Sequence, residues 1–213
     1  MRDAGWAVLV PVKRLPEAKT RLHLDHLGLS RERVALAMAE DTVAAAAACP
    51  VVGLVLVVTD DPVAAEALAR LGARVVPDEP AAGLNAALRH GASVVATRPG
   101  RGVAALGADL PALRPAELTA ALRAAGRTPA GGFTPDVAGT GTTLLAAPAG
   151  VPLRPRFGRG SAAAHAAAGL RRLGGAWPSL RRDVDTAEDL RAAGRLGLGL
   201  HTAALAGVPA GGA

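Results

Sequence analysis

Residues 6–22, WAVLVPVKRLPEAKTRL, run from an apolar segment directly into a loop rich in positive charge. The segment WAVLV is typical of a buried β-strand, and Pro11 and Pro16 stiffen the chain that leaves it. A buried strand that gathers cations where it ends leaves two interpretations: the loop is solvated surface, or it holds a strongly anionic ligand. The cations concerned are Lys13, Arg14, Lys19 and Arg21.

Apolar, valine-rich segments alternate with helical patterns from this first strand as far as residue 126. Ser30 is placed to cap the first helix, and Gly72 is placed to end the second. Strands that are apolar throughout and separated by helices are typical of a parallel sheet covered on both faces. The predicted strands are 6–12, 53–59, 73–77 and 102–109, and the predicted helices are 30–49, 61–72, 83–96 and 114–126.

The pattern changes after residue 126. Two short strands, 131–136 and 140–148, flank a glycine-rich turn and predict an antiparallel element that closes the sheet. Helices are predicted over 161–174 and over 186–197, the second capped by Thr186. We therefore expect one α/β domain over residues 1–197 and a small-residue-rich, poorly ordered tail over 198–213.

The composition limits the classes of function. The chain of 213 residues carries a net charge of +6, but its arginines are scattered, and it has no Tyr and two Phe to stack on bases. This distribution does not favour nucleic-acid binding. Cys49 is the single cysteine, so a disulfide framework is excluded, and we expect a small buried side chain there. No stretch reaches the roughly 18 apolar residues of a membrane span, and a cytoplasmic protein is expected.

Lysine occurs in the first loop and nowhere else in the sequence. Of the 24 basic residues, two are lysines, and both, Lys13 and Lys19, lie between residues 10 and 22. A composition dominated by Ala, Gly and Arg is typical of a GC-rich genome, which tends to replace Lys by Arg. The two retained lysines suggest that a compact ammonium group is needed in this loop.

Two acidic motifs could hold a cation. In GADLP, Asp109 follows an apolar strand, so its carboxylate is either a Mg²⁺ ligand at the ligand-binding edge of the sheet or a turn residue. In RRDVDTAEDL, Asp183 and Asp185 alternate along an extended segment and share one face. We favour Asp183 as a metal ligand and Asp185 as its support; the alternative is that Asp185 caps the next helix together with Thr186.

Glycine and hydroxyl side chains mark an anion site. In FGRGSAAAH, Gly158 and Gly160 allow close backbone approach, and Ser161 opens a helix whose free N–H groups attract anions. The upstream motif GTGTTLL adds three threonine hydroxyls around Gly139 and Gly141. The alternative is an ordinary serine cap and a glycine turn. His165 is expected to be a packing residue and Asp136 a turn residue.

Several common catalytic signatures are missing. No Gly-x-Gly-x-x-Gly motif follows the first strand, and no P-loop GxxxxGK motif occurs. The sequence order also offers no Ser-His-Asp arrangement. These absences argue against nicotinamide-dependent redox chemistry and against P-loop phosphoryl transfer.

Six motifs, in order along residues 6–195, resemble one family. They are VPVKRLPEAKTRL, DEPAAGLNAAL, ALGADLPAL, GTGTTLL, PRFGRGSAAAH and DVDTAEDL. The chain resembles the phosphoenolpyruvate/2-phospho-L-lactate guanylyltransferases of deazaflavin coenzyme F-420 biosynthesis. Other guanylyltransferases of the fold begin with a glycine-rich loop of the type LAGGxSxRMG, which this chain lacks. The resemblance implies a three-layer, Rossmann-like fold of the nucleotide-diphospho-sugar-transferase type.

The resemblance also implies a reaction, in which a phosphate oxygen of phosphoenolpyruvate attacks the α-phosphorus of GTP and pyrophosphate leaves. Asp109 and Asp183 would then hold Mg²⁺. The acceptor would lie on Thr142, Gly158 and Ser161, with Thr143 replacing Thr142 if the register shifts by one. Lys13, Lys19 and Arg21 would hold the triphosphate, with Lys13, Lys19 and Asp109 as the catalytic groups. The guanine pocket would be formed by Pro80, Gly83, Leu84 and Asn85.

Four alternatives stay open at this stage. The acceptor could be 2-phospho-L-lactate, although the composition favours phosphoenolpyruvate, which is associated with actinobacterial relatives. The enzyme could be another nucleotidyltransferase, using CTP or a sugar phosphate. The chain could also be a nucleic-acid binder or an inactive paralogue, and a homodimer is possible.

Overall fold

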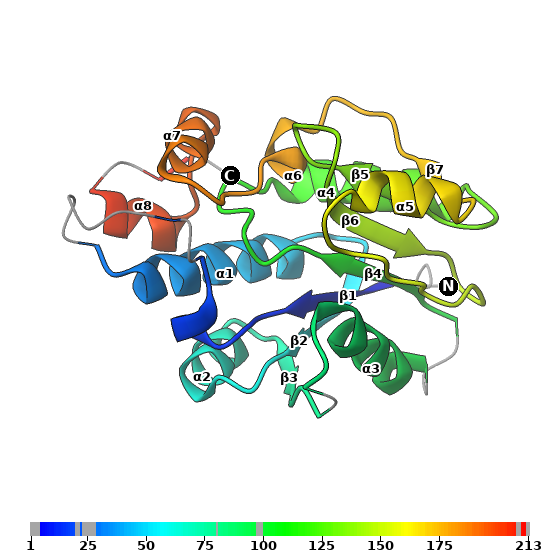
Figure 1. The fold of residues 1–213 in the computed structure, drawn as a ribbon, viewed down its shortest axis with the longest axis horizontal. Helices are drawn as coiled ribbons and strands as arrows, with labels where there is room; N and C mark the ends of the chain where they lie inside the picture. The colour runs from blue at the N-terminus through cyan, green and yellow to red at the C-terminus, as the bar shows by residue number, and fades with distance from the viewer. Residues whose placement is uncertain are drawn as a thin grey trace.

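Seven strands form one sheet in the computed structural model, which describes residues 5–19, 22, 29–79, 81–96, 100–207 and 210–211. The strand order across the sheet is β3-β2-β1-β4-β6-β5-β7 (Figure 1). The strands are β1 (Trp6–Pro11), β2 (Val52–Val58), β3 (Arg74–Val76), β4 (Gly102–Leu106), β5 (Gly132–Pro135), β6 (Thr142–Ala147) and β7 (Arg171–Arg172).

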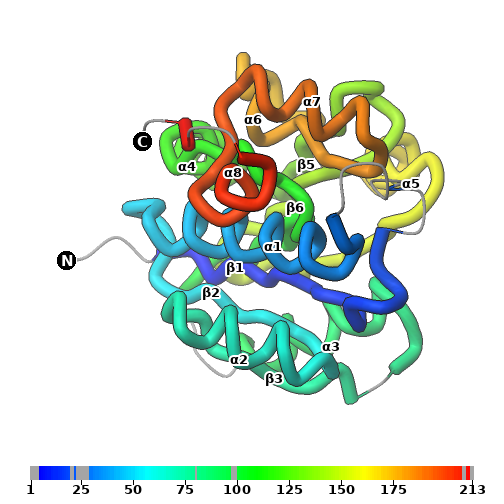
Figure 2. The backbone as a smooth tube through the Cα atoms, turned by 90° about the vertical axis from the view of Figure 1, so that its left-hand side faces the viewer, coloured from blue at the N-terminus to red at the C-terminus, as the bar shows by residue number. Residues whose placement is uncertain are grey.

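Helices cover both faces of this sheet and produce three layers. One face packs against α1, α2 and α4, and the other packs against α3 and α5 (Figure 2). No helix in the described ranges is long and apolar enough to cross a membrane. The helices are η1 (Leu15–Glu17), α1 (Arg31–Ala47), α2 (Pro62–Arg70), α3 (Leu84–Ala96), α4 (Pro115–Gly126), α5 (Ser161–Ala167), α6 (Pro178–Arg181), α7 (Ala187–Leu196) and α8 (Leu200–Ala206).

The central strand β1 explains why its sequence is apolar without interruption. It pairs in parallel with β2 on one side and with β4 on the other, for example through Val8 opposite Val55 and Ala104. Val8 and Val10 face the core under α1, whereas Ala7 and Leu9 face the core under α3. All four side chains have no exposed surface. The prediction of a mostly parallel sheet with both faces covered is confirmed.

Strand β6 is the predicted antiparallel element and decides where the site lies. It runs antiparallel to both β4 and β5, so the start of β6 lies at the same edge of the sheet as the ends of β1 and β4. The backbone N–H of Gly107, just after β4, donates to the carbonyl of Thr143 at a distance of 2.9 Å. The GADLP and GTGTTLL motifs therefore meet at one edge.

The helix predicted over 161–174 is shorter than expected. It ends at Ala167, and Gly169 adopts a left-handed backbone with φ +80°. The N–H groups of Gly169 and Leu170 donate to the carbonyls of Ala166 and His165, which closes the last turn of the helix. The chain then continues as β7, which pairs with β5. The prediction is wrong beyond Ala167, because the glycine stop outweighs the helical propensity that follows.

The segment from Leu198, predicted to be a poorly ordered tail, contains helix α8, which lies beside α1 (Figures 1 and 2). Leu198 and Ala203 are buried against the helices that cover this end of the molecule. The carboxylate of Asp41 on α1 accepts hydrogen bonds from the N–H groups of His201 and Thr202, each at 2.9 Å. The first turn of α8 is thus capped by a residue 160 positions upstream, a contact that local composition does not reveal.

Candidate active site

A cavity of about 630 Å³ opens at the edge of the sheet where β1 and β4 end and β6 begins. Its volume lies within the range of small-molecule sites, and it follows the general rule that α/β sheets bind ligands beyond the carboxyl ends of their strands. Most of the predicted site residues in the described ranges line it, namely Lys13, Lys19, Leu84, Asp109, Thr142, Gly158 and Asp183.

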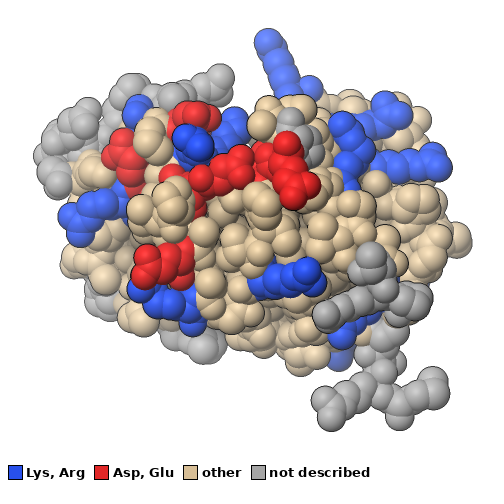
Figure 3. Space-filling view, turned by 90° about the horizontal axis from the view of Figure 1, so that it is seen from below, with Lys and Arg blue, Asp and Glu red and all other residues tan. Residues whose placement is uncertain are grey.

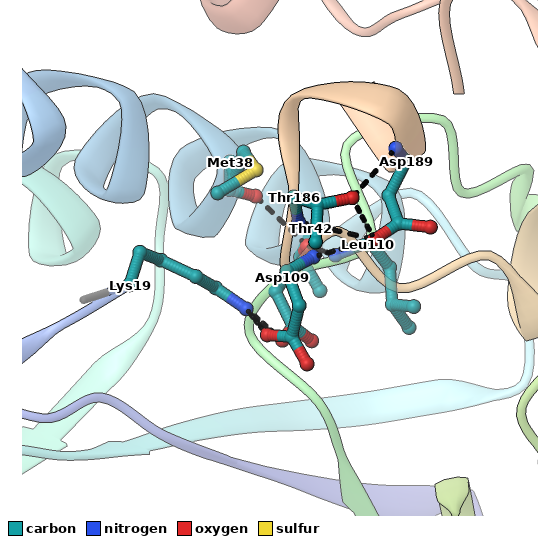
Figure 4. Close-up of polar contacts among 8 residues, drawn as sticks. Lys19, Met38, Thr42, Asp109, Leu110, Thr186 and Asp189 are labelled. Atoms are coloured by element: carbon teal, nitrogen blue, oxygen red, sulfur yellow. Dashed lines mark hydrogen bonds and ion pairs between the residues drawn. The ribbon is translucent and has the colours of Figure 1, made fainter. Parts of the chain in front are cut away.

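Asp109 is held in place from both sides along the chain. A Cβ at Gly107 would lie 2.8 Å from Oδ1 of Asp109, so a side chain there would displace the carboxylate from its position. On the other side, the hydroxyl of Thr42 accepts a hydrogen bond from the N–H of Leu110 at 3.1 Å and donates to the carbonyl of Met38 at 2.8 Å (Figure 4). The buried helix α1 thereby fixes the backbone that carries the carboxylate.

Asp183 joins Asp109 although 74 positions separate the two residues in the sequence. The N–H of Val184 donates to the carbonyl of Asp109 at 3.1 Å, which ties the two segments together. The pKa of Asp183 is raised to about 7, mainly by burial and also by the negative charges of Asp109, Asp185 and Asp136. The negative charge that surrounds this carboxyl group favours the arrival of a cation.

Lys19 already lies among these carboxylates. Its Nζ contacts Asp109 at 2.5 Å and Asp185 at 2.7 Å, as Figure 4 shows for Asp109. Burial alone would lower the pKa of Lys19, but the two carboxylates outweigh burial and raise it above its usual value. Lys19 is therefore charged at neutral pH and is one of the two lysines that the first loop retains.

The geometry separates the two interpretations of Asp185. Thr186 is the cap of α7, and its partner in the capping box is Asp189, which accepts from the Thr186 N–H at 3.0 Å. The carboxylate of Asp185 instead points to Lys19. Asp185 thus supports the acidic cluster, whereas the capping role belongs to Thr186 and Asp189.

The donor set suits a hard divalent cation. Asp109 and Asp183 present carboxylate oxygens at the cavity, and Mg²⁺ is commonly bound by one or two carboxylates, with water and substrate phosphates completing its shell. Within the described part of the chain, no three His, Cys, Asp or Glu side chains converge as a complete metal site. An ion here would therefore need oxygens from a bound substrate, as is usual for Mg²⁺ in nucleotide chemistry.

Thr142 lines the cavity, and its hydroxyl group lies beside that of the buried Ser161. Ser161 is 2% exposed, and its Oγ donates to Oγ1 of Thr142 at 3.2 Å. Ser161 is the first residue of α5, and Gly160, with φ +70°, takes the cap position, so Ser161 is not the cap of the alternative interpretation. Gly158, with φ +134°, lines the cavity. Thr143 is also buried, and its hydroxyl points to the carbonyl of Thr134 at 3.4 Å. Thr142 is thus the threonine whose hydroxyl lies beside Ser161.

The predicted guanine pocket is brought together only in part. Leu84 lines the cavity, and Gly83, with φ +88°, starts α3. The amide of Asn85, however, is already used at both ends: Nδ2 donates to the carbonyl of Phe157 at 2.9 Å, and Oδ1 accepts from its N–H at 2.8 Å. Asn85 thus anchors the loop that contains Gly158. Pro80 and Arg21 lie outside the described residues.

Sequence reasoning missed two contributors to this site. Thr42, in the middle of an alanine-rich helix, secures the Asp109 loop, and His165 contacts Thr142 through Nδ1 at 3.0 Å. The sequence around Thr42 does not reveal this role, because the backbone N–H that Thr42 binds belongs to Leu110, 68 positions away. His165 was noticed, but its position on an alanine-rich helix suggested packing alone.

Comparison with known proteins identifies the family of this chain. Residues 34–186 match the model of the MobA-like NTP transferase domain. A phosphoenolpyruvate guanylyltransferase from Salinispora arenicola is 62% identical over 207 residues, which cover 96% of this chain and 95% of that protein. The chain belongs to the phosphoenolpyruvate guanylyltransferase family. A second member of the family, from Geodermatophilus obscurus, is 60% identical over 208 residues, which cover 95% of this chain and 94% of that protein.

The fold of this guanylyltransferase family member also matches a solved structure. A nucleotidyl transferase from Methanothermobacter superposes with a TM-score of 0.63 and 21% identity, covering 90% of this chain and 97% of that chain. At this identity the likeness concerns the fold alone. The expected nucleotidyltransferase fold and the expected enzyme class are both confirmed.

Proposed function

We propose that this chain transfers GMP from GTP to the phosphate of phosphoenolpyruvate. A phosphate oxygen of the acceptor forms a bond to the α-phosphorus of GTP, the bond from that phosphorus to the bridging oxygen of the β-phosphate breaks, and pyrophosphate leaves with the bonding electrons. The observation that carries the proposal is the pairing of Asp109 and Asp183 at one cavity, with lysines and hydroxyl groups around it. The names of the close relatives support the choice of substrates.

Asp109 and Asp183 are the residues that would hold Mg²⁺. The bound ion would reduce the negative charge on phosphate oxygens that otherwise repel one another. Asp185 remains with Lys19, which balances part of the charge of the acidic cluster. The chain itself contributes the fixed position of the two carboxylates, which the Val184–Asp109 backbone bond and the Thr42 contact maintain.

The two lysines supply positive charge for the triphosphate. Lys13 is exposed at the mouth of the cavity, and Lys19 lies deeper, beside the carboxylates. A lysine ammonium is a compact charge on a flexible stem, so it can follow the pyrophosphate as it departs. Arg21 would add to this charge, and Gly83, Leu84 and Pro80 would border the guanine base.

The acceptor would lie on the opposite wall. Thr142 offers a hydroxyl group at the cavity, the buried Ser161 supports that hydroxyl by a hydrogen bond, and Gly158 leaves the backbone accessible because it has no side chain. Hydrogen bonds from hydroxyl groups to a charged phosphate or carboxylate are among the stronger polar contacts in proteins. The proposed reaction places the chain in the biosynthesis of coenzyme F-420. A cytoplasmic location and a homodimer stay predictions.

The surface supports an enzyme more than a nucleic-acid binder. On the face seen in Figure 3, acidic side chains gather in a band, and basic side chains lie around it in separate groups. Electrostatic binding to nucleic acid relies on a basic stripe that follows the phosphates. On the described part of this face, the basic side chains do not form such a stripe.

The test is a substrate screen that follows pyrophosphate release. The protein is incubated with Mg²⁺, each of the four nucleoside triphosphates, and phosphoenolpyruvate, 2-phospho-L-lactate or a sugar phosphate. We expect release with GTP and phosphoenolpyruvate, and its loss in a folded Asp109→Asn variant. Release with a sugar phosphate alone, or with CTP alone, would refute the proposal. A higher rate with 2-phospho-L-lactate would correct the acceptor.

A further inference from the structure

His165 lies on α5 without exposed surface, between two aromatic rings. Its ring centroid is 5.6 Å from that of Phe133 and 5.3 Å from that of Phe157. Burial is the main reason that the pKa of His165 falls to about 4, and the charge of Arg156 adds to it. The ring is therefore neutral near pH 7, and both of its nitrogens need partners inside the protein.

A backbone amide decides which ring nitrogen carries the proton. The N–H of Arg156 donates to Nε2 of His165 at 3.0 Å. A nitrogen that accepts a hydrogen bond has no proton, so the proton of the neutral ring lies on Nδ1. Nδ1 is 3.0 Å from Oγ1 of Thr142. His165 is thus the donor in this contact, and Thr142 is the acceptor.

The second contact of Thr142 completes the argument. Its oxygen also accepts from the hydroxyl of Ser161 at 3.2 Å. A hydroxyl group has two lone pairs and one proton, so both lone pairs are occupied. Within the described residues, Thr142 Oγ1 has no further polar partner. Its own proton is therefore left for an acceptor in the cavity, which Thr142 lines.

We propose that His165 is a positioning residue that turns the hydroxyl proton of Thr142 toward an anionic oxygen of the phosphorylated acceptor. The inference rests on the proposed function, which assigns Thr142 to the acceptor site. His165 itself touches no substrate. Its contribution is to keep the hydroxyl from rotating its proton back into the protein, so the donor is already oriented when the acceptor arrives.

Two amide variants separate this role from a packing role. Asn at 165 carries its N–H donor at the position of Nδ1, near Thr142, whereas Gln carries its amide at the position of Nε2, near Arg156. We expect His165→Phe to raise the acceptor KM about tenfold without changing the GTP KM, as for one lost hydrogen bond to a charged group. His165→Asn should keep the acceptor KM near the wild-type value, whereas His165→Gln should raise it as His165→Phe does.

The reverse order, with Gln restoring the acceptor KM and Asn failing, would show that His165 only anchors the Arg156 backbone and would overturn the proposal. If His165→Phe raised the KM of GTP as much as the KM of the acceptor, the proposal would be overturned as well. Thermal melts verify that each variant is folded. If His165→Phe does not fold, the comparison of Asn with Gln still decides between the two roles.

Thr142→Ala separates this inference from the proposed function. If Thr142→Ala leaves the acceptor KM unchanged, the proposed acceptor site is wrong. If it raises that KM, adding His165→Phe should cause no further increase, and an additive increase would refute the role of His165. Independently of activity, ¹⁵N NMR of His165 at pH 7 should show a protonated Nδ1 and an unprotonated Nε2. The opposite tautomer would contradict the proposal.

Discussion

The protonation state of single residues in this protein depends on contacts with residues that are distant in the sequence. The neutral ring of His165 is an example, since its low pKa comes from burial beneath Phe133 and Phe157 and from the nearby Arg156. In the unfolded chain the same side chain has a pKa near 6.5. Folding therefore favours the neutral ring. The stabilisation is complete above pH 6.5 and is lost as the pH falls toward 4.

The pH dependence of stability is the prediction at this scale. Between pH 7 and pH 5, the wild-type protein should lose about 2 kcal/mol more of its free energy of unfolding than His165→Asn, which has no titrating ring. Urea denaturation of both proteins at the two pH values measures the difference. Carboxylates that titrate in both proteins cancel in this comparison. Parallel losses in the two proteins would show that His165 does not titrate as the structure indicates.

The residue types of the site could be predicted from sequence, but their relationships could not. Asp109, Asp183, Thr142 and Gly158 were identified from local motifs, and all of them line one cavity. The engagement of Asn85 with the Phe157 backbone was not foreseen, because it joins positions 72 residues apart. An amide that looks available in sequence is thus already paired in the folded protein.

At the scale of elements, the predictions held where hydrophobic periodicity or a local cap determines the structure. Ser30 caps α1 through the N–H of Arg33, and Gly72 follows the end of α2 with φ +86°. The predictions differed from the structure where a distant residue or a single glycine decides. Helix α5 ends at Ala167 and not at the predicted residue 174, and α8 forms in the segment expected to be poorly ordered.

Helix α8 depends on the carboxylate of Asp41, and this dependence can be tested. Asp41→Ala leaves the N–H groups of His201 and Thr202 without their acceptor, which should lower the free energy of unfolding by about 2 kcal/mol. Hydrogen exchange of the α8 amides should accelerate. Exchange of the β1 amides should change only by as much as the global stability of the protein changes.

The matched control is Glu40→Gln on the neighbouring position of α1. Glu40 contacts only the side chain of His201 among the described polar contacts, at 3.3 Å, and it accepts no α8 backbone N–H. Its replacement should leave α8 exchange nearly unchanged. Equal acceleration in the two variants would mean that charge on α1, and not the backbone cap, holds α8 in place.

At the scale of the whole molecule, the fold brings together two carboxylates that are far apart in the chain. Asp109 follows β4, Asp183 precedes α7, and the antiparallel β6 brings the hydroxyl of Thr142 to the same edge. The sheet and its layers could be predicted from alternating apolar segments and helices. The convergence of Asp109 and Asp183 could not, because residues 131–181 between them form the strands β5, β6 and β7 and the helices α5 and α6, whose packing no local pattern specifies.

Binding of Mn²⁺, used in place of Mg²⁺, tests most directly whether these two carboxylates share one ion. Electron paramagnetic resonance would measure Mn²⁺ affinity in the presence of GTP for the wild type, Asp109→Asn and Asp183→Asn, with the exposed Glu188→Gln as control. We predict that each Asn variant binds Mn²⁺ at least about tenfold more weakly, while the control binds as the wild type does. Wild-type affinity in either Asp109→Asn or Asp183→Asn would contradict the account.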